Sequence, residues 1–309
     1  MAIRFERVVI VMMENAARSL VLENPYMSAL RQKGVYLANA YGLTHPSQPN
    51  YIASIGGDTF GINGDDPFWV APYDCTADPN QQPPVTSVID LLEAKGLSWK
   101  AYAENLQSTD IVPPPTQLFV PLNDPVYPPV GPQPSSQTSP LFARRHVPVL
   151  SYPNIVSNPQ RVANIVNAQQ NFEPDLAAGK LPNYIWYSPN LVNNGHSIQE
   201  SNGAIKAVVP PGAQNIDDIA RFLQGFLGPD PIQRFPPKTL IVITFDEAFP
   251  YSDYGIYTLL IGDLLDAGTA RAEPYGHYSL LRSVEENFQI GSLGRNDAAA
   301  TPYWFLAED

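Results

Sequence analysis

One segment near the start of the chain restricts the fold more than any other feature of the sequence. It reads Arg7-Val-Val-Ile-Val-Met-Met13 and is apolar at successive positions, without the alternation of a strand that has one face in water. Such a strand is covered on both faces, as in a parallel sheet. Two later runs, 184–187 and 239–245, have the same character. The sequence therefore predicts a mostly parallel sheet at the centre of the protein.

Helical patterns separate the predicted strands. Weaker strand candidates lie at 35–37, 99–102 and 255–261. Helix-like spacing of apolar residues occurs at 25–33, 85–95, 158–167, 216–227 and 278–288. Strands that alternate with helices predict an α/β fold, a three-layer α/β/α sandwich with helices on both faces of the sheet. We expect one domain, 1–309.

A Pro-rich irregular insertion is expected at about 110–140, where Pro, Gln, Ser and Thr replace any helical or strand periodicity. Long irregular segments in a compact domain are either surface excursions or lids over a site. The sequence leaves both interpretations open.

The charge of the chain bears on its partners. A formal net charge of −12 argues against nucleic-acid binding, because that requires Lys and Arg along the phosphate backbone. A phosphate ester can still bind if a cation supplies the positive charge. Since the apolar run ending at Met13 is too short for a signal sequence or a membrane span, we expect a soluble, cytoplasmic protein. A leader removed earlier would make it secreted or periplasmic.

Polar residues directly follow two of the predicted central strands. Glu14 and Asn15 follow the first strand, and Asp246 and Glu247 follow the strand at 239–245. Ligands of open α/β sheets bind beyond the carboxyl ends of the strands. Three carboxylates and an amide form an oxygen-rich shell that suits one or more divalent metal ions, with Mg, Mn, Ca, Fe and Zn all open.

A stiff turn carries the candidate nucleophile. The segment Thr44-His-Pro-Ser-Gln-Pro-Asn-Tyr51 places a proline on each side of Ser47, ahead of a helix expected to start near Asn50. A helix that begins there directs free backbone N–H groups at an anion. The Ser47 hydroxyl needs a base or a metal to become nucleophilic, and His45 is close in sequence. We therefore predict Ser47 and His45 as catalytic, with Asn50 beside the substrate.

The other histidines occupy loop and turn positions. His196 follows the strand at 184–187, and His277 precedes a predicted helix. Both positions suit groups that bind phosphate or transfer protons. His146 follows Arg144 and Arg145, and this basic group is either an edge of the pocket that contacts substrate or a solvated cluster.

In this order, the blocks resemble the phosphoesterase family that includes AcpA-type acid phosphatases, bacterial phospholipases C and plant non-specific phospholipases C. The matching blocks are Val11-Met-Met-Glu-Asn15, His45-Pro-Ser-Gln-Pro-Asn-Tyr51, Ser188-Pro-Asn-Leu191 with Gly195-His196, Ile243-Thr-Phe-Asp-Glu247, and His277-Tyr-Ser-Leu-Leu-Arg282. They extend over most of the chain. Two departures, Ala16-Ala17 after the first block and Ala248-Phe-Pro-Tyr251 after the fourth, affect substrate contacts beside the metal.

The resemblance implies an alkaline-phosphatase-like fold and a set of site roles. Metal ligands would be Glu14, Asn15, Ser47, Asp246 and Glu247, with Ser47 also the nucleophile. Groups that contact the phosphate or transfer protons would be His45, His196 and His277.

Several functions fit these residues. We expect hydrolysis of phosphomonoesters through a phosphoserine on Ser47, as in an acid phosphatase. The alternatives are a phospholipase C-type diesterase acting on phospholipid headgroups, a phosphotransferase, and a non-catalytic binder on the same fold. Aromatic residues near the predicted mouth, Phe249, Tyr251 and Tyr254, suit either a lipid glycerol or an aromatic leaving group.

Overall fold

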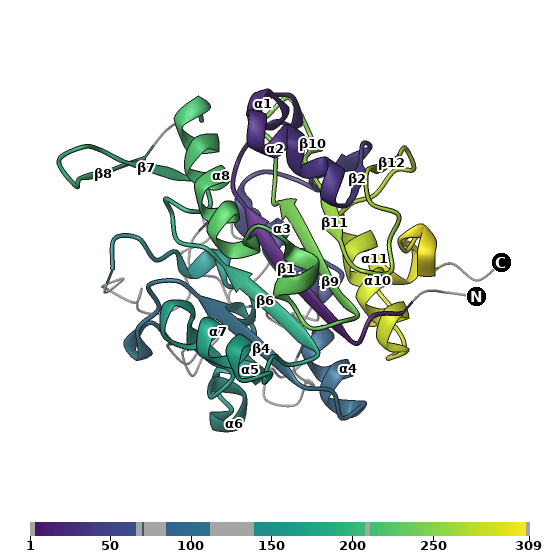
Figure 1. Cartoon of the computed structure of the whole chain (residues 1–309). Coiled ribbons are helices and arrows are strands. Elements are labelled where there is room, and N and C mark those ends of the chain that lie inside the picture. Colours follow the sequence, from purple (N-terminus) through teal and green to yellow (C-terminus); the bar gives the residue numbers. More distant parts are fainter. Residues whose placement is uncertain (1–3, 66–69, 71–84, 112–138, 208–210, 307–309) are drawn as a thin grey trace.

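A central sheet organises the protein (Figure 1). The computed structural model describes residues 4–65, 70, 85–111, 139–207 and 211–306. Within these ranges the main sheet has eight strands in the order β12-β2-β11-β9-β1-β6-β4-β5. Strands β11 and β2 run antiparallel to each other, as do β11 and β9, whereas the pairs from β9 through β1, β6 and β4 to β5 are parallel.

The strands are β1 (Arg7–Met13), β2 (Val35–Leu37), β3 (Ala40–Tyr41), β4 (Trp99–Ala103), β5 (Ile165–Asn167), β6 (Tyr184–Ser188), β7 (Ser197–Gln199), β8 (Ile205–Ala207), β9 (Thr239–Phe245), β10 (Gly255–Ile256), β11 (Leu259–Ile261) and β12 (Thr269–Arg271). Strands β3 and β10 form a separate pair, as do β7 and β8.

The α-helices are α1 (Arg18–Glu23), α2 (Pro25–Leu30), α3 (Ser47–Gly56), α4 (Val88–Ala94), α5 (Pro153–Val156), α6 (Pro159–Val162), α7 (Ala168–Ala177), α8 (Ala213–Leu227), α9 (Pro231–Arg234), α10 (His277–Phe288) and α11 (Asn296–Ala299). Short 3₁₀ helices include η1 (Arg31–Lys33), η3 (Ser108–Asp110), η4 (Arg144–His146), η5 (Pro148–Ser151) and η6 (Trp304–Leu306). No helix among the described residues has the length and apolarity needed to cross a membrane.

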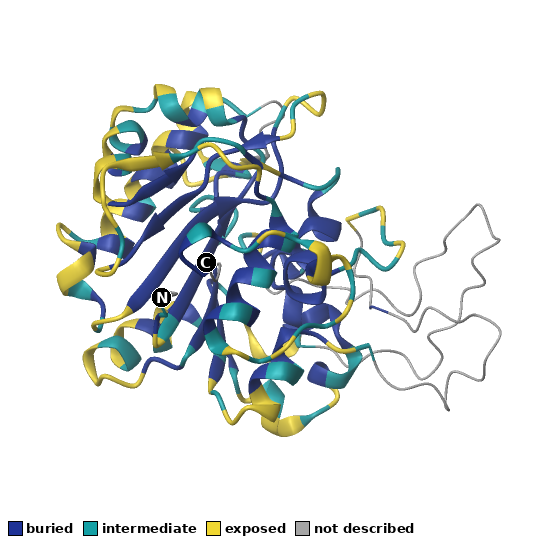
Figure 2. Cartoon of the chain, turned by 90° about the vertical axis from the view of Figure 1, so that its right-hand side faces the viewer, coloured by how far each residue is buried: buried dark blue, intermediate teal, exposed yellow. Residues whose placement is uncertain are grey.

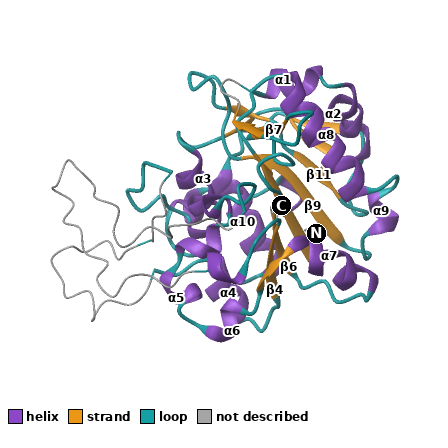
Figure 3. Cartoon of the chain, turned by 90° about the vertical axis from the view of Figure 1, so that its left-hand side faces the viewer, coloured by secondary structure: helices purple, strands orange, loops and turns teal. Residues whose placement is uncertain are grey.

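Helices cover both faces of the sheet. Figure 3 shows α3, α4 and α10 on one face and α1, α2, α7 and α8 on the other. The central strands are consequently buried along their length, whereas exposed residues gather on the outer helices and loops (Figure 2). The predicted three-layer α/β/α arrangement and the mostly parallel sheet are confirmed.

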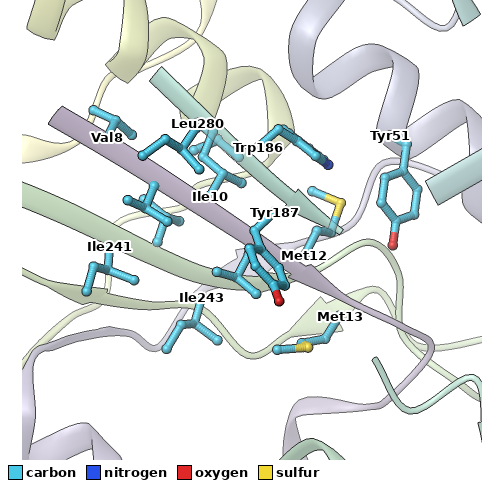
Figure 4. Close-up of a cluster of buried hydrophobic side chains, with 14 of the residues drawn as sticks. Val8, Ile10, Met12, Met13, Tyr51, Trp186, Tyr187, Ile241, Ile243 and Leu280 are labelled. Carbon is cyan, nitrogen blue, oxygen red and sulfur yellow. The ribbon is translucent and has the colours of Figure 1, made fainter. Parts of the chain in front are cut away.

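Strand β1 shows why a continuous apolar run was needed at the centre. Its successive side chains point to opposite faces, so both helical layers pack against it. In Figure 4, Ile10 and Met12 lie on the side of Tyr51 and Leu280, which belong to α3 and α10. Met13 lies on the other side of the strand (Figure 4), and the alternation of side chains places Val9 and Val11 there too. The six residues from Val8 to Met13 are each at most 1% exposed.

Two predicted elements differ from the structure. The helix predicted at 158–167 is wrong: α6 is a single turn, and Ile165–Asn167 forms the edge strand β5. Pairing with β4 decides this, because β-branched Ile165 and Val166 complete the sheet edge. The strand predicted at 255–261 divides into β10 and β11, which belong to different sheets. The Pro-rich segment predicted at about 110–140 lies mostly outside the described residues.

Candidate active site

The register of the central strands brings the predicted carboxylates together. Strands β1 and β9 pair in parallel up to Met13 and Phe245, so Glu14 and Asp246 leave the sheet side by side. The Asn15 backbone N–H donates to Asp246 Oδ1 at 3.3 Å. Glu14, Asp246 and Glu247 are each at most 1% exposed. The two strand ends therefore form one buried acidic cluster.

Ser47 lies at the centre of this cluster. Its Oγ is 3.0 Å from Glu14 Oε2, 3.1 Å from Glu247 Oε1 and 3.3 Å from Asn15 Oδ1. Asn15 has a φ of +23°, a conformation that asparagine tolerates better than most residues. The hydroxyl can donate its single proton to one of these three acceptors at a time. The oxygens of Glu14, Asn15 and Glu247 therefore surround the Ser47 oxygen atom.

The turn before Ser47 is fixed by Asn50. The Asn50 side-chain oxygen accepts the N–H groups of Leu43 and Thr44, at 2.9 and 3.2 Å. Its amide nitrogen donates to the carbonyls of Thr44 and Pro46. Helix α3 begins at Ser47, earlier than the predicted start near Asn50. Asn50 thus positions the serine turn, and its predicted contact with substrate stays a prediction.

Burial without a neutralising cation disfavours the charged forms of the acidic cluster. Burial raises the pKa of Glu14, and the charge of Asp246 raises it further. Burial and Glu247 raise the pKa of Asp246, and burial and Glu14 raise that of Glu247. Asp246 Oδ2 is buried and has no hydrogen-bond partner among the described residues. The cluster requires bound protons or a cation.

These donors fit a divalent cation, because they offer carboxylate, amide and hydroxyl oxygens from separate side chains around one point. In the described part of the chain, no group of three or more His, Cys, Asp or Glu side chains already has the arrangement of a metal site. The unpartnered Asp246 oxygen and the raised pKa values of the three carboxylates are the observations that favour a cation here. The metal stays a prediction.

His45 and His277 both contact the Asp246–Glu247 pair. His45 Nδ1 contacts Glu247 Oε2, and the ring packs between Tyr251 and Tyr254 with centroid distances of 4.7 and 4.9 Å. His277, the first residue of α10, donates from Nε2 to the Asp246 carbonyl oxygen at 2.5 Å. Burial lowers the pKa of His277 to about 4. Their predicted catalytic roles stay predictions.

His146 joins the acidic cluster from the other side. Its Nε2 is 3.0 Å from Glu14 Oε1, without the alignment of a full hydrogen bond, and its Nδ1 is 3.1 Å from Asn194 Nδ2. The ring stacks on Tyr51, whose hydroxyl donates to Glu14 at 2.7 Å. Both ring nitrogens of His146 therefore lie beside protein atoms. Its predicted substrate contact stays a prediction.

His196 lies beside His146, with ring centroids 5.7 Å apart, and contacts Arg145. The sequence left open whether Arg145 belongs to an edge of the pocket or to a solvated cluster, and the structure places it in contact with His196. Tyr51 and Asn194 were missed, because neither residue type marks a site when its partners are unknown.

Comparison with solved structures identifies the fold. The fold is similar to that of a protein in the alkaline phosphatase superfamily from Vibrio parahaemolyticus, with a TM-score of 0.54 at 10% identity over 96% of this chain and 71% of that one. It is also similar to the phosphonate monoester hydrolase of Agrobacterium radiobacter, with a TM-score of 0.52 at 13% identity over 92% and 74%. At these identities the likeness establishes the fold alone, and the predicted alkaline-phosphatase-like fold is confirmed.

Sequence comparison identifies the family. A model of the Phosphoesterase family matches residues 22–291, and the chain belongs to this family. It is 32% identical over 302 residues to a probable acid phosphatase of Kluyveromyces lactis, covering 96% of this chain and 61% of that protein. An acid phosphatase of Aspergillus fumigatus is 32% identical over 305 residues, covering 96% and 58%. The chain thus spans about three fifths of the length of these fungal relatives.

A bacterial relative matches over more of its own length. The phosphatidylinositol-3-phosphatase of Mycobacterium tuberculosis is 26% identical over 305 residues, covering 97% of this chain and 83% of that protein. These relatives are all named as phosphatases, in agreement with the predicted enzyme class, a phosphoric ester hydrolase. The predicted family is confirmed.

Proposed function

We propose that this chain is a metal-dependent phosphomonoesterase that hydrolyses its substrate through a phosphoserine on Ser47. The observation that carries the proposal is the position of Ser47 Oγ, at the first residue of a buried helix and within 3.3 Å of three side-chain oxygens. The names of the fungal relatives support a phosphatase.

The proposed metal ligands are Ser47 and the four residues around its oxygen: Glu14, Asn15, Asp246 and Glu247. A divalent ion there would supply Lewis-acid stabilisation of phosphoryl oxygens and lower the pKa of the serine hydroxyl. Oxygen donors favour Mg, Mn or Ca, and Fe and Zn remain candidates.

The chain's own residues carry the proton transfers. The Ser47 proton moves to a carboxylate, with Glu14 and Glu247 both within 3.1 Å of the hydroxyl oxygen. The serine oxygen then bonds to phosphorus as the bond to the leaving group breaks, and the leaving oxygen takes up the proton that the carboxylate received. Water next attacks the phosphoserine, which restores the hydroxyl and releases inorganic phosphate. The N-terminus of α3 stabilises the negative charge that gathers beside it.

Of the two histidines predicted as the acid, His196 is the better candidate to contact the substrate. His277 Nε2 already donates to the Asp246 carbonyl. His196 Nδ1 is buried and has no hydrogen-bond partner among the described residues. A substrate oxygen would provide one.

A phosphate carried on a phospholipid headgroup is the second candidate substrate. The relative named phosphatidylinositol-3-phosphatase favours it. This substrate is also a phosphomonoester, so the same site chemistry applies. The exposed rings of Tyr251 and Tyr254, 51% and 45% exposed, lie beside His45 and offer apolar surface for a leaving group.

The test is release of inorganic phosphate from a panel of phosphomonoesters, phosphoinositides and short-chain phosphatidylcholine, with and without chelator. We expect metal-dependent phosphate release from monoesters. Diacylglycerol formed from phosphatidylcholine would instead indicate a phospholipase C. No product from any substrate after addition of Mg, Mn, Ca, Fe and Zn would contradict the proposal.

A further inference from the structure

The contact between Arg145 and His196 fixes where the proton of the histidine lies. Arg145 Nη2 is 3.1 Å from His196 Nε2. A guanidinium can only donate, so Nε2 must accept and the ring proton of the neutral histidine is on Nδ1. Burial, and then the charge of Arg145, lower the pKa of His196 to about 4, which agrees with a neutral ring. The Nδ1–H group has no acceptor among the described residues.

The neighbouring histidine has the opposite arrangement. Asn194 donates through its amide nitrogen to His146 Nδ1, so the His146 proton is on Nε2, which faces Glu14. The same Asn194 side chain accepts the His196 backbone N–H at 2.9 Å. The Nε2–H of His146 thus lies 3.0 Å from a carboxylate oxygen, without the alignment of a hydrogen bond, whereas the Nδ1–H of His196 has no hydrogen-bond partner among the described residues.

The loop that carries Asn194 and His196 is packed against helix α8. Gly195 has a φ of +90°, and a Cβ atom there would lie 2.5 Å from Ile219 Cδ1. The Gly195 carbonyl accepts from the Asn215 side chain at 2.8 Å. Both Ile219 and Asn215 belong to α8. The direction of His196 is thus set by packing against a long helix.

The charge of Arg145 is only loosely balanced. Its Nε is buried and has no hydrogen bond among the described residues, and the nearest carboxylate oxygen in an ion pair, Asp65 Oδ2, is 3.9 Å away. Asp65 Oδ1 accepts the backbone N–H of Gln48, the residue after Ser47. Asp65 therefore links Arg145 to the first turn of α3. The side chain of Arg145 is 21% exposed, which leaves it open to a ligand.

We propose that Arg145 and His196 together bind the oxygen atoms of a dianionic phosphoryl group, with Arg145 holding His196 as an Nδ1–H donor. The inference rests on the proposed function, because it concerns the same site. A fixed cation interacts more strongly with a dianion than with a monoanion, so this pair selects phosphomonoesters over phosphodiesters. Arg145 is in addition a positioning residue for His196.

The first test reads the histidine tautomer directly. Nitrogen NMR of protein labelled with ¹⁵N-histidine distinguishes protonated from unprotonated ring nitrogens, and His196→Gln identifies the signals of His196. We expect Nδ1–H in the wild type and in Arg145→Lys, which keeps a donor. In Arg145→Met we expect the proton to shift to Nε2. An unchanged tautomer in Arg145→Met would overturn the positioning role.

The second test measures binding of inorganic phosphate by calorimetry at a pH where phosphate is mainly dianionic. Arg145→Met should weaken binding about tenfold, and Arg145→Lys should weaken it less. The matched control is Arg221→Met, because the Arg221 side chain is 71% exposed and its ion pair among the described residues is with Asp218, away from the site. Phosphate affinity of Arg145→Met equal to that of the wild type would overturn the binding role.

Turnover separates this inference from the proposed function. In Arg145→Met the ratio of kcat/KM for a monoester to that for a diester should fall at least about threefold. An unchanged ratio would contradict the selection of dianions and leave the phosphatase proposal intact. Arg145-dependent phosphate binding by a protein that hydrolyses no monoester would instead support the inference and contradict the proposed function.

Discussion

The two halves of the candidate site are built in different ways. The acidic half, defined as Glu14, Asp246 and Glu247, comes from the ends of two adjacent parallel strands. The basic half, defined as Arg145, His146 and His196, comes from a 3₁₀ turn and a loop. The strand ends place three carboxylates side by side at a spacing that the sheet fixes. The 3₁₀ turn and the loop supply the basic side chains that lie beside them.

Burial acts on the two halves in opposite directions. It raises the pKa of each carboxylate in the acidic half and lowers the pKa of both histidines in the basic half. The three carboxylates and the two histidines therefore tend towards their neutral forms when the site holds no ligand. A metal ion would favour the ionised carboxylates of the acidic half, and a phosphoryl anion would pair with Arg145. The metal ion would thus bind to the acidic half and the phosphoryl anion to the basic half.

The largest effect on turnover should come from a substitution of Ser47, the proposed nucleophile, whose oxygen lies beside the acidic half. We expect Ser47→Ala to lower kcat at least about 10³-fold, because the nucleophile is lost. The matched control is Ser54→Ala on the same helix, whose hydroxyl bonds to the Tyr51 carbonyl and should leave turnover largely intact. Steady-state phosphate release measures both. Wild-type turnover by Ser47→Ala would rule out the nucleophile.

Asp246 should separate catalysis from stability. Asp246→Asn should lower kcat/KM about 100-fold or more, because bound metal contributes several kcal/mol of transition-state stabilisation. In chelated protein the same change should raise the Tm, since it removes a carboxylate buried beside Glu14 and Glu247. Activity and metal analysis check the first outcome, and thermal melts with chelator check the second. Full metal content with full activity would show that the acidic half is not the metal site.

A substitution of Asn194 tests how the two histidines of the basic half are held in place. Its side chain bonds to both His146 and the His196 backbone, and it is fully buried. Asn194→Ala should lower the free energy of unfolding by roughly 1–3 kcal/mol, because buried partners are left unpaired. Asn202→Ala is the control, since that asparagine lies in the exposed β7–β8 turn. Equal denaturation midpoints for the two variants would show that Asn194 does not hold the histidines.

A buried carboxylate outside both halves gives the smallest expected effect. Burial, and then the charge of Asp297, raise the pKa of Glu285 to about 8 from an ordinary value of 4.5. Because the folded state then holds a proton that the unfolded state has lost, stability should fall as pH rises between about 4.5 and about 8. Glu285→Gln should flatten this part of the Tm–pH curve, whereas Glu286→Gln, at a partly exposed side chain, should not. Parallel curves for Glu285→Gln and the wild type would contradict the raised pKa.

Much of the acidic half could be predicted from the sequence. A continuous apolar run specifies a strand buried on both faces, and the residue after such a strand lies at the edge where α/β sheets bind ligands. The sequence therefore placed Glu14 and Asp246 in the site, and the two prolines around Ser47 indicated a rigid turn. These inferences are local, because each depends on residues next to one another in the chain.

The tertiary structure decided what depends on distant partners. Only the register of β1 with β9 brings Glu14 beside Asp246, which is 232 positions later. Only the packing of η4 against the loop after β6 places Arg145 on His196, 51 positions away. In a neutral histidine, one ring nitrogen accepts a hydrogen bond and the other carries the proton. The position of the proton therefore follows from these tertiary contacts. The sequence determines which chemical groups are present, and the tertiary structure determines which of them meet.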